Sequence, residues 1–432
     1  MRVIDFFFIL LLCYTSFCCL KSIKVFKVWL NHYILTNVYW LFCLFLSIYF
    51  NDYQRPVSNE VYYIFFTGLV FFNLTLFTSK IPPIPKNINQ IVISLEKRRS
   101  LELIVLLTIV PIAYYNFKLM QSGVELWEIN HDYWHENRST GFYLRDAFIQ
   151  NVVSPTVYVL MSTCFYANFN KKGRWHVLIT ILIGTLFAVL DVLVTGGGRT
   201  ILMKIALVYF LSYFAHKMLK DVNIVAKINV AVVAVFVIVA VAGIGWASSG
   251  RGHDASTISL LSNRLILFPA LFESYYINTD ICQGYTLGTS MFETPIAFLS
   301  YPFKFFGFEG FERISGIEQR KVFVPALYAY TNADVSAYLY YMRDFGYLGI
   351  FLGPYLVGVI YNYLWKICRT DSFLLVFYFV GIGMTCIDSS YPFRRGFVFI
   401  LLFVFICNKY MRTHDNKAKN LYPFSNYIKR KK

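Results

Sequence analysis

The feature that most constrains this chain is a series of about eleven apolar segments, most of them roughly 17 to 25 residues long, the length that a helix needs to cross a bilayer. Apolar residues make up 57% of the sequence and charged residues only 15%, which is unlike a water-soluble domain. The sequence therefore predicts an all-α, polytopic membrane protein with about 11 transmembrane helices. These spans cover residues 3–20, 28–50, 61–79, 101–120, 149–169, 175–194, 200–216, 228–247, 335–364, 372–391 and 396–408.

Lysine and arginine are distributed unequally between the connections. Alternate connections and the C-terminal tail hold most of the lysines, which marks them as cytoplasmic and places the N-terminus outside and the C-terminus inside. On the opposite side the basic residues are mainly arginines. Because a guanidinium group grips an anion through two parallel hydrogen bonds, an arginine-rich outer face predicts an anionic ligand there.

The chain divides into four parts. Residues 1–247 hold eight spans and an outer loop at 121–148, residues 248–334 form a large outer loop, residues 335–408 hold three more spans, and residues 409–432 form a basic cytoplasmic tail. Long loops in a bundle with otherwise short connections are common places for function. In the large loop, the mixed apolar and aromatic stretches 260–277 and 293–311 predict short helices at the membrane surface.

Several classes of function are disfavoured. The net charge of +16 lies largely in cytoplasmic loops and the tail, so it indicates attraction to anionic membrane lipids and no nucleic-acid partner. No cysteine and histidine spacing resembles a zinc site, and no phosphate-binding loop or dinucleotide fingerprint is visible in the sequence. We therefore expect no metal and no other cofactor.

The sharpest local motif is the glycine turn 195–200, which contains Arg199 and opens directly into the span at 200–216. Its glycines allow a close approach of the backbone to a ligand, and the helix that follows directs unpaired N–H groups to the same place. Lys204 adds a charge inside an apolar helix, which favours an anion site. The alternative is a tight hairpin whose arginine extends to the lipid headgroups.

A second polar group follows residue 247. Arg251 lies between two glycines, and Arg264 belongs to the first predicted loop helix. His253 precedes Asp254, and the two side chains are a candidate titrating pair near neutral pH. An exposed, purely polar loop start is the alternative interpretation of His253.

A third group lies where the span at 335–364 begins. Arg343 and Asp344 are adjacent, so on a helix they point about 100° apart and need separate partners. Structural salt bridges between helices are the alternative. Gly346, Gly349 and Gly353 supply a small-residue face for close helix packing.

These features together resemble the bacterial O-antigen and oligosaccharide repeat-unit polymerases of the Wzy type. The resemblance rests on the turn Gly197-Gly198-Arg199, on the large outer loop before the third-last span, and on the stretch 332–349 with its core Asp344-Phe345-Gly346. It implies a GT-C-like fold in the bacterial inner membrane and inverting glycosyl transfer at the periplasmic face. The product would be O-antigen or a related surface polysaccharide of the lipopolysaccharide type.

The resemblance also implies substrates and partners. The donor and acceptor would be oligosaccharides carried by undecaprenyl diphosphate, and a chain-length regulator protein is a candidate partner beside the membrane lipids. A lipid diphosphate leaving group needs preorganised donors, and the candidates for this task are Arg199, Arg251, Arg264 and Arg343. The acceptor hydroxyl needs a general base, for which Asp344 and His253 are the first candidates and Asp254 and Glu273 stay open.

Two other functions compete. A ligase that transfers a finished glycan needs a similar diphosphate site, and the sequence separates it poorly from a polymerase. A flippase for the same lipid-linked glycan would more often show paired halves and charges near the bilayer midplane. Here the unusual charges collect toward the outer face, which favours chemistry at the surface over translocation.

Overall fold

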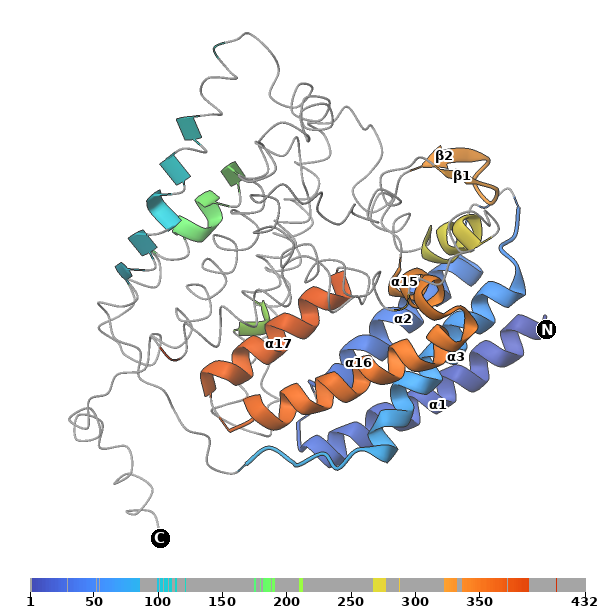
Figure 1. The fold of residues 1–432 in the computed structure, drawn as a ribbon, viewed down its shortest axis with the longest axis horizontal. Coiled ribbons are helices and arrows are strands. Elements are labelled where there is room, and N and C mark those ends of the chain that lie inside the picture. The colour runs from blue at the N-terminus through green and yellow to red at the C-terminus, as the bar shows by residue number, and fades with distance from the viewer. Residues whose placement is uncertain are drawn as a thin grey trace.

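A computed structural model describes the N-terminal residues 2–85, except 29, 52 and 54. Later in the chain it describes residues 267–276, 287, 322–331, 336–370 and 372–387. It also describes isolated positions between 99 and 121 and between 175 and 212, and residue 409. The described part is mostly helical (Figure 1). Its labelled helices are α1 (Val3–Phe26), α2 (His32–Tyr49), α3 (Asn59–Thr78), α15 (Ala337–Phe345), α16 (Tyr347–Cys368) and α17 (Ser372–Ile387).

Four of these helices, α1, α2, α3 and α16, are long and apolar enough to cross a membrane. Their bounds agree with the predicted spans to within a few residues, except for α1, which extends six residues further, and α16, which starts later than predicted. Helix α17 matches the predicted span at 372–391. The expectation of a mostly helical chain is therefore confirmed for the described residues, and four of its helices have the length and composition of membrane spans. Most of the remaining predicted spans lie largely outside the described residues.

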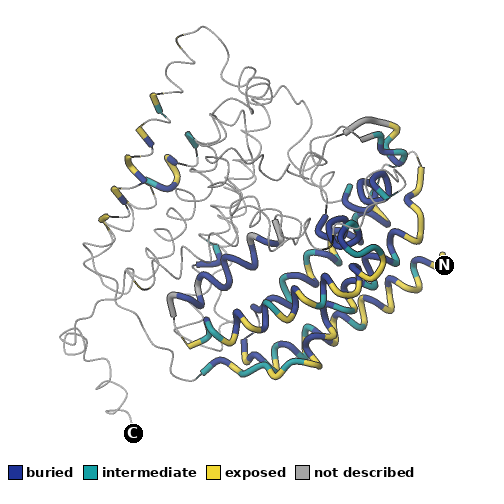
Figure 2. Tube along the Cα trace, viewed as in Figure 1, coloured by how far each residue is buried: buried dark blue, intermediate teal, exposed yellow. Residues whose placement is uncertain are grey.

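The N-terminal and C-terminal helices form one bundle, although almost 270 positions separate α3 from α16 in the sequence. Helix α3 packs against α16 and α1, α17 packs against α2 and α16, and α15 lies on α16 (Figure 1). Figure 2 shows the buried positions on the inward faces and exposed positions along α1. Those exposed positions include Phe7, Leu10 and Phe17, as expected for a helix that faces lipid.

Small residues set the close contacts of α16. A Cβ atom on Gly358 would lie 3.1 Å from the Phe72 carbonyl oxygen and would overlap the Thr75 side chain of α3. A Cβ atom on Gly349 or Gly353 would overlap Tyr341 of α15. The predicted small-residue face is thus confirmed at Gly349 and Gly353, whose partner is the short helix that precedes α16, whereas Gly346 separates the two helices.

Buried polar side chains tie the helices together inside the apolar bundle. The side-chain amides of Asn37 and Asn73 bond each other reciprocally at 2.8 Å, which links α2 to α3. Tyr33 bonds Thr75 at 2.8 Å and accepts a hydrogen bond of 2.9 Å from Asn362, which adds α16 to the network. These groups are all buried, and their mutual pairing offsets the cost of placing polar groups in an apolar medium.

The predicted span at 335–364 is divided into two helices. Gly346 separates α15 from α16 and has φ 58° and ψ −144°, a conformation that is essentially restricted to glycine. The charged pair Arg343 and Asp344, followed by Gly346, interrupts the apolar pattern at this point, a signal that the prediction of a single span did not use. The membrane-length segment is consequently α16, Tyr347–Cys368.

Two other elements belong to the predicted large loop. A helix covers residues 267–276, inside the stretch 260–277, as predicted, but eight of its ten residues are buried, so it packs into the core and not on the surface as expected. The second stretch at 293–311 lies outside the described residues. An antiparallel hairpin, which we did not predict, pairs β1 (Val322–Val324) with β2 (Ala329–Thr331). Its turn contains Tyr328 at φ 54°.

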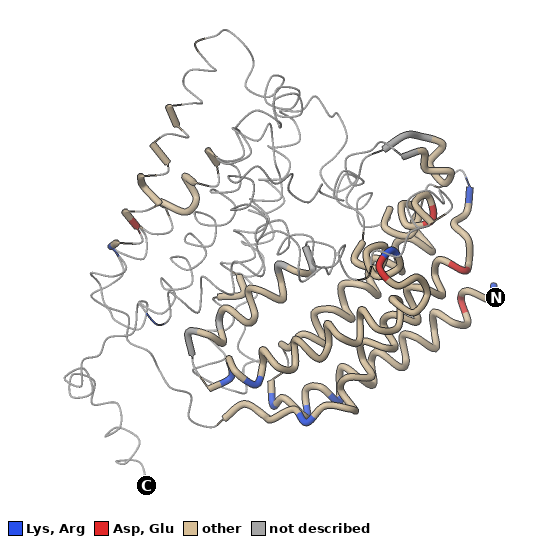
Figure 3. Tube along the Cα trace, viewed as in Figure 1, with Lys and Arg blue, Asp and Glu red and all other residues tan. Residues whose placement is uncertain are grey.

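Charged residues divide the bundle into two unlike ends (Figure 3). One end, formed where α1 and α16 finish, carries Lys21, Lys24, Lys27, Lys80, Lys366 and Arg369. The proline-containing linker after α3, residues 80–85, packs there, because Trp365 Nε1 donates to the Pro82 carbonyl at 2.8 Å and Arg369 donates to the Pro83 carbonyl at 2.7 Å. The opposite end, which we call the acidic end, holds Asp5, Glu60, Glu273 and Asp344, with Arg2, Arg55 and Arg343.

Candidate functional site

The candidate site lies at the acidic end, where three segments distant in sequence meet. They are the start of α3, the helix at 267–276, and the junction of α15 with α16 (Figures 1 and 3). The junction carries Arg343 and Asp344, which the sequence singled out. The structure therefore places these two residues at the same end of the bundle as polar groups from both halves of the described chain.

Arg343 and Asp344 belong to the last turn of α15. Asp344 is fully buried at 0% exposure, whereas Arg343 is partly exposed. The carbonyl oxygen of Asp344 accepts a hydrogen bond of 3.2 Å from the backbone N–H of Leu287, a residue of the large loop. Arg343 thus has access to solvent at the acidic end, while the carboxylate of Asp344 is enclosed by protein.

Gly346 fixes the direction of the chain between these residues and α16. Its N–H donates to the Met342 carbonyl at 2.6 Å and ends α15, and its carbonyl accepts from the Gly349 N–H at 2.9 Å and begins α16. A single glycine therefore terminates one helix and starts the next. This geometry sets where Asp344 lies relative to Tyr347.

Glu60 is the centre of a cluster that joins the three segments. Its Oε1 accepts hydrogen bonds from the Tyr347 hydroxyl at 2.7 Å and from the Tyr276 hydroxyl at 3.1 Å. The two hydroxyls also contact each other. Glu60 is exposed and Tyr347 is 51% exposed, so this cluster is open to the surroundings of the bundle.

Glu273 has a different role in the same region. It is 4% exposed, and its Oε1 accepts a hydrogen bond of 2.8 Å from the backbone N–H of Ser58, the residue that precedes α3. A carboxylate beside the first turn of a helix also stabilises the positive end of the helix dipole. Glu273 therefore holds the start of α3, and with it Glu60, against the helix at 267–276.

Tyrosines of the neighbouring connection add further hydroxyl groups. Ser47 bonds the Tyr53 hydroxyl at 3.2 Å and the Tyr62 hydroxyl at 3.0 Å. Burial raises the pKa of Tyr53 above its ordinary value, so this phenol is protonated and able to donate at neutral pH. The connection between α2 and α3 is thereby fastened to the acidic end.

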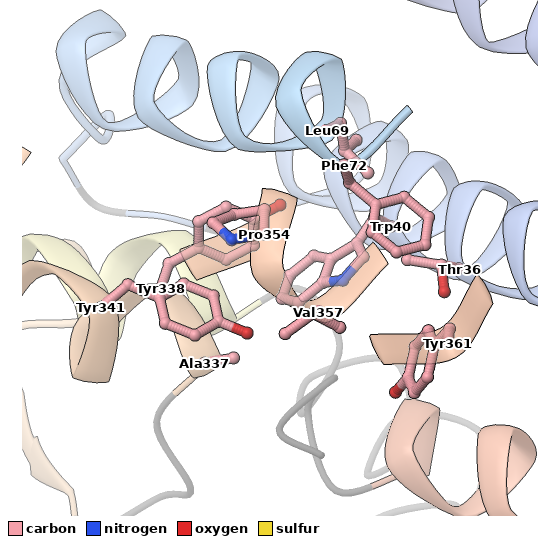
Figure 4. Close-up of a pocket in the computed structure, with 10 residues that line it drawn as sticks. All are labelled: Thr36, Trp40, Leu69, Phe72, Ala337, Tyr338, Tyr341, Pro354, Val357 and Tyr361. Atoms are coloured by element: carbon pink, nitrogen blue, oxygen red, sulfur yellow. The ribbon is translucent and has the colours of Figure 1, made fainter. Parts of the chain in front are cut away.

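A pocket lies deeper in the bundle, between α2, α3, α15 and α16 (Figure 4). Its volume is about 20 Å³, enough for one water-sized molecule and far too small for a sugar ring. Aromatic residues dominate its lining, and it is not a substrate site in this structure. The lining residues are Thr36, Trp40, Leu69, Phe72, Ala337, Tyr338, Tyr341, Pro354, Val357 and Tyr361.

Of the predicted site residues, the structure describes Arg343, Asp344 and Glu273. Three of the four proposed diphosphate ligands and the histidine lie outside the described residues, so their convergence stays a prediction; these are Arg199, Arg251, Arg264 and His253. Lys204 and Asp254 also lie outside. Among the residues that are described, no group of three His, Cys, Asp or Glu side chains is placed to hold a metal ion.

The sequence did not single out Glu60, Tyr276 or Tyr347. A weak signal exists, because Glu60 directly precedes the predicted span at 61–79 and Tyr347 belongs to the stretch 332–349. Neither position reveals its partners, which come from elsewhere in the chain. Comparisons with known proteins offer no guide to this site, since no family model, curated protein or solved structure matches the chain.

Proposed function

We propose that the chain is a membrane-embedded glycosyltransferase that polymerises oligosaccharide repeat units carried by undecaprenyl diphosphate. It acts at the periplasmic face of a bacterial inner membrane and builds O-antigen or a related surface polysaccharide. The transfer inverts the configuration at the anomeric carbon and uses no nucleotide or metal, because the lipid diphosphate already activates the donor.

The observation that carries this proposal is the gathering of Arg343, Asp344 and the Glu60 cluster at one end of the bundle, opposite the lysines. Lysine-rich ends of membrane helices are typical of the cytoplasmic side, which makes the acidic end periplasmic. The N-terminus then lies outside and the C-terminal tail inside. The proposed chemistry therefore takes place on the side where the acceptor glycans are displayed.

Arg343 is the cation at this end that suits a diphosphate. It is partly exposed on the last turn of α15, and its guanidinium group can donate two parallel hydrogen bonds to phosphate oxygens. Negative charge develops on the leaving diphosphate as the glycosidic bond breaks, and fixed donors stabilise it. Arg199, Arg251 and Arg264 complete this site in the proposal.

Asp344 and His253 are the proposed general bases. In the reaction the acceptor hydroxyl oxygen bonds to the anomeric carbon, the bond to the diphosphate breaks, and the hydroxyl proton passes to the base. Because Asp344 is fully buried here, direct contact with an acceptor requires the α15–α16 junction to open.

A ligase is the second candidate, because it needs the same diphosphate site. A flippase is less well supported, since the described charges lie at the two ends of the bundle and the polar groups in its interior are neutral pairs such as Asn37 and Asn73. The ligase differs from the polymerase only in its acceptor.

One experiment separates these functions. Purified protein is reconstituted with lipid-linked repeat units, without nucleotide or metal, and the products are separated by size. A polymerase yields a ladder of chains with increasing numbers of units. A single transferred unit, or unchanged substrate, argues against the polymerase. A ligase leaves these lipid-linked units unchanged and transfers glycan only when its own, different acceptor is added.

A further inference from the structure

The Glu60 cluster has the composition of a carbohydrate-binding site. It combines a carboxylate, which accepts hydrogen bonds from hydroxyl groups, with two aromatic rings, which can pack against the C–H faces of a sugar ring. We propose that Glu60, Tyr276 and Tyr347 form a subsite for an uncharged pyranose of the acceptor glycan. This inference rests on the proposed function for the identity of its ligand as a glycan.

The first argument is the state of Glu60. Its carboxylate accepts from two phenol hydroxyls and lies in the exposed first turn of α3, not in the core. A carboxylate has about four acceptor positions, so two phenols do not saturate it. Sugar hydroxyl groups can therefore bond Glu60 in addition to, or in place of, the phenols.

The second argument is how rigidly the rings are held. Tyr276 stacks on Phe272 with an interplanar angle of 15° and a centroid distance of 6.0 Å, and its ring meets that of Tyr347 edge to face at 74°. Phe272 is 1% exposed, so the support beneath Tyr276 belongs to the core. The aromatic surface is therefore formed before a ligand arrives, which lowers the entropy that binding loses.

The third argument is position. Tyr347 is the first residue of α16 and follows Gly346 directly, while Arg343 lies four residues earlier, in the last turn of α15. A glycan held by Tyr347 thus lies at the same helix junction that carries the proposed diphosphate ligand. Negative charge on Glu60 and the buried carboxylates nearby disfavours sugars that carry their own carboxylate.

The test measures glycan binding to the full-length protein in nanodiscs by saturation-transfer NMR. The probes are the neutral glycans maltotriose, mannotriose, chitotriose and lactose, with trigalacturonate as the anionic comparison. We expect at least one neutral probe to receive saturation on its ring C–H protons, and trigalacturonate to receive none. Failure of every neutral probe at millimolar concentration, or equal binding of trigalacturonate, would overturn the proposal.

Three variants locate the site. Glu60→Gln keeps the shape but loses the charge, so it weakens neutral-glycan binding about fivefold, the difference between charged and neutral hydrogen bonds. Tyr347→Phe removes one hydroxyl and weakens binding about threefold. Tyr363→Phe, a change of a 62% exposed tyrosine further along the same helix, leaves binding unchanged. Equal affinity in wild type, Glu60→Gln and Tyr347→Phe would place the binding elsewhere.

Thermal unfolding of each variant shows whether it is folded. If Glu60→Gln is not folded, the binding of Tyr347→Phe alone decides the test. The size ladder separates this inference from the proposed function. Glycan binding that depends on Glu60 without any ladder refutes the polymerase and keeps the subsite. A ladder of normal length in Glu60→Gln with unchanged glycan binding refutes the subsite and keeps the polymerase.

Discussion

Replacing Gly346 with alanine tests whether one residue sets the geometry of the candidate site. Gly346 has φ 58° and ψ −144°, ends α15 through its N–H and begins α16 through its carbonyl. An alanine Cβ is strongly disfavoured at these angles. Gly346→Ala must therefore either retain the strained backbone or rearrange the junction that orients Arg343 and Tyr347.

The magnitude follows from the backbone angles. A non-glycine residue held in a sparsely populated conformation costs about 1 to 3 kcal/mol, and a change of 1 kcal/mol shifts the midpoint of thermal unfolding by roughly 2 to 4 °C in a large domain. We expect Gly346→Ala to lower the melting temperature by several degrees. Relaxation of the junction would reduce this shift but would disturb the hydrogen bonds at Met342 and Gly349.

Two measurements cover both outcomes. Thermal unfolding in nanodiscs reports the strain, and hydrogen exchange of the amides in 342–350 reports the rearrangement. Leu348→Ala is the control, because Leu348 is 58% exposed and exposed substitutions change stability by about 0.5 kcal/mol or less. If Gly346→Ala shows the melting temperature and the amide exchange of the wild type, the reasoning about this junction is refuted.

Three more predictions concern the bundle and the site. Asn37→Leu lowers the melting temperature because it leaves the Asn73 amide without its partner in an apolar interior, and Asn37→Leu with Asn73→Leu recovers most of the loss. A double-mutant cycle gives a coupling of about 0.6 kcal/mol, at most about 1.7 kcal/mol. Zero coupling would contradict the reciprocal bonds. Trp365→Phe destabilises the protein by about 1 kcal/mol in denaturant unfolding because it removes the bond to the Pro82 carbonyl, whereas an unchanged midpoint would mean that the linker contributes nothing. Arg343→Lys lowers the rate of chain extension at least about tenfold with little change in melting temperature, because lysine retains the charge but loses the paired donors. Full activity of this variant would mean that Arg343 contacts lipid headgroups and does not bind the diphosphate.

The membrane helices were predictable because the bilayer imposes a length and a composition on each of them. Helices α2 and α3 begin and end within a few residues of their predicted spans, and α1 continues past its predicted end through Lys21 and Lys24. Lys21 tolerates this position because its ammonium group lies 3.6 Å from the centroid of the Phe77 ring. That contact is made with a residue of α3, and the hydropathy of the α1 segment alone contains no information about α3.

The features that were missed depend on partners distant in sequence or on one backbone angle. The break at Gly346 depends on a backbone conformation that hydropathy does not report, although the charges of Arg343 and Asp344 directly precede it. The hairpin of β1 and β2 turns at Pro325–Tyr328 without the glycine or asparagine that usually marks such turns. The Glu60 cluster unites residues 60, 276 and 347, which only the tertiary fold brings together.

For the candidate site, two of the residues that the sequence singled out, Arg343 and Asp344, lie at the acidic end, and their functional roles stay a prediction. They drew attention because charges beside an apolar span are costly. Their environments differ, since Arg343 is partly exposed and Asp344 is fully buried. A pattern of adjacent residues does not reveal this difference, which arises only in the tertiary fold.

The central claim, glycosyl transfer from a lipid diphosphate, is tested most directly by measuring the undecaprenyl diphosphate that the purified protein releases from lipid-linked repeat units. The account predicts one molecule of free lipid diphosphate for each glycosidic bond formed, with no nucleotide consumed and with strongly reduced release in Arg343→Lys. Glycan that crosses the membrane while every unit stays attached to its lipid, with no diphosphate released, would contradict the account.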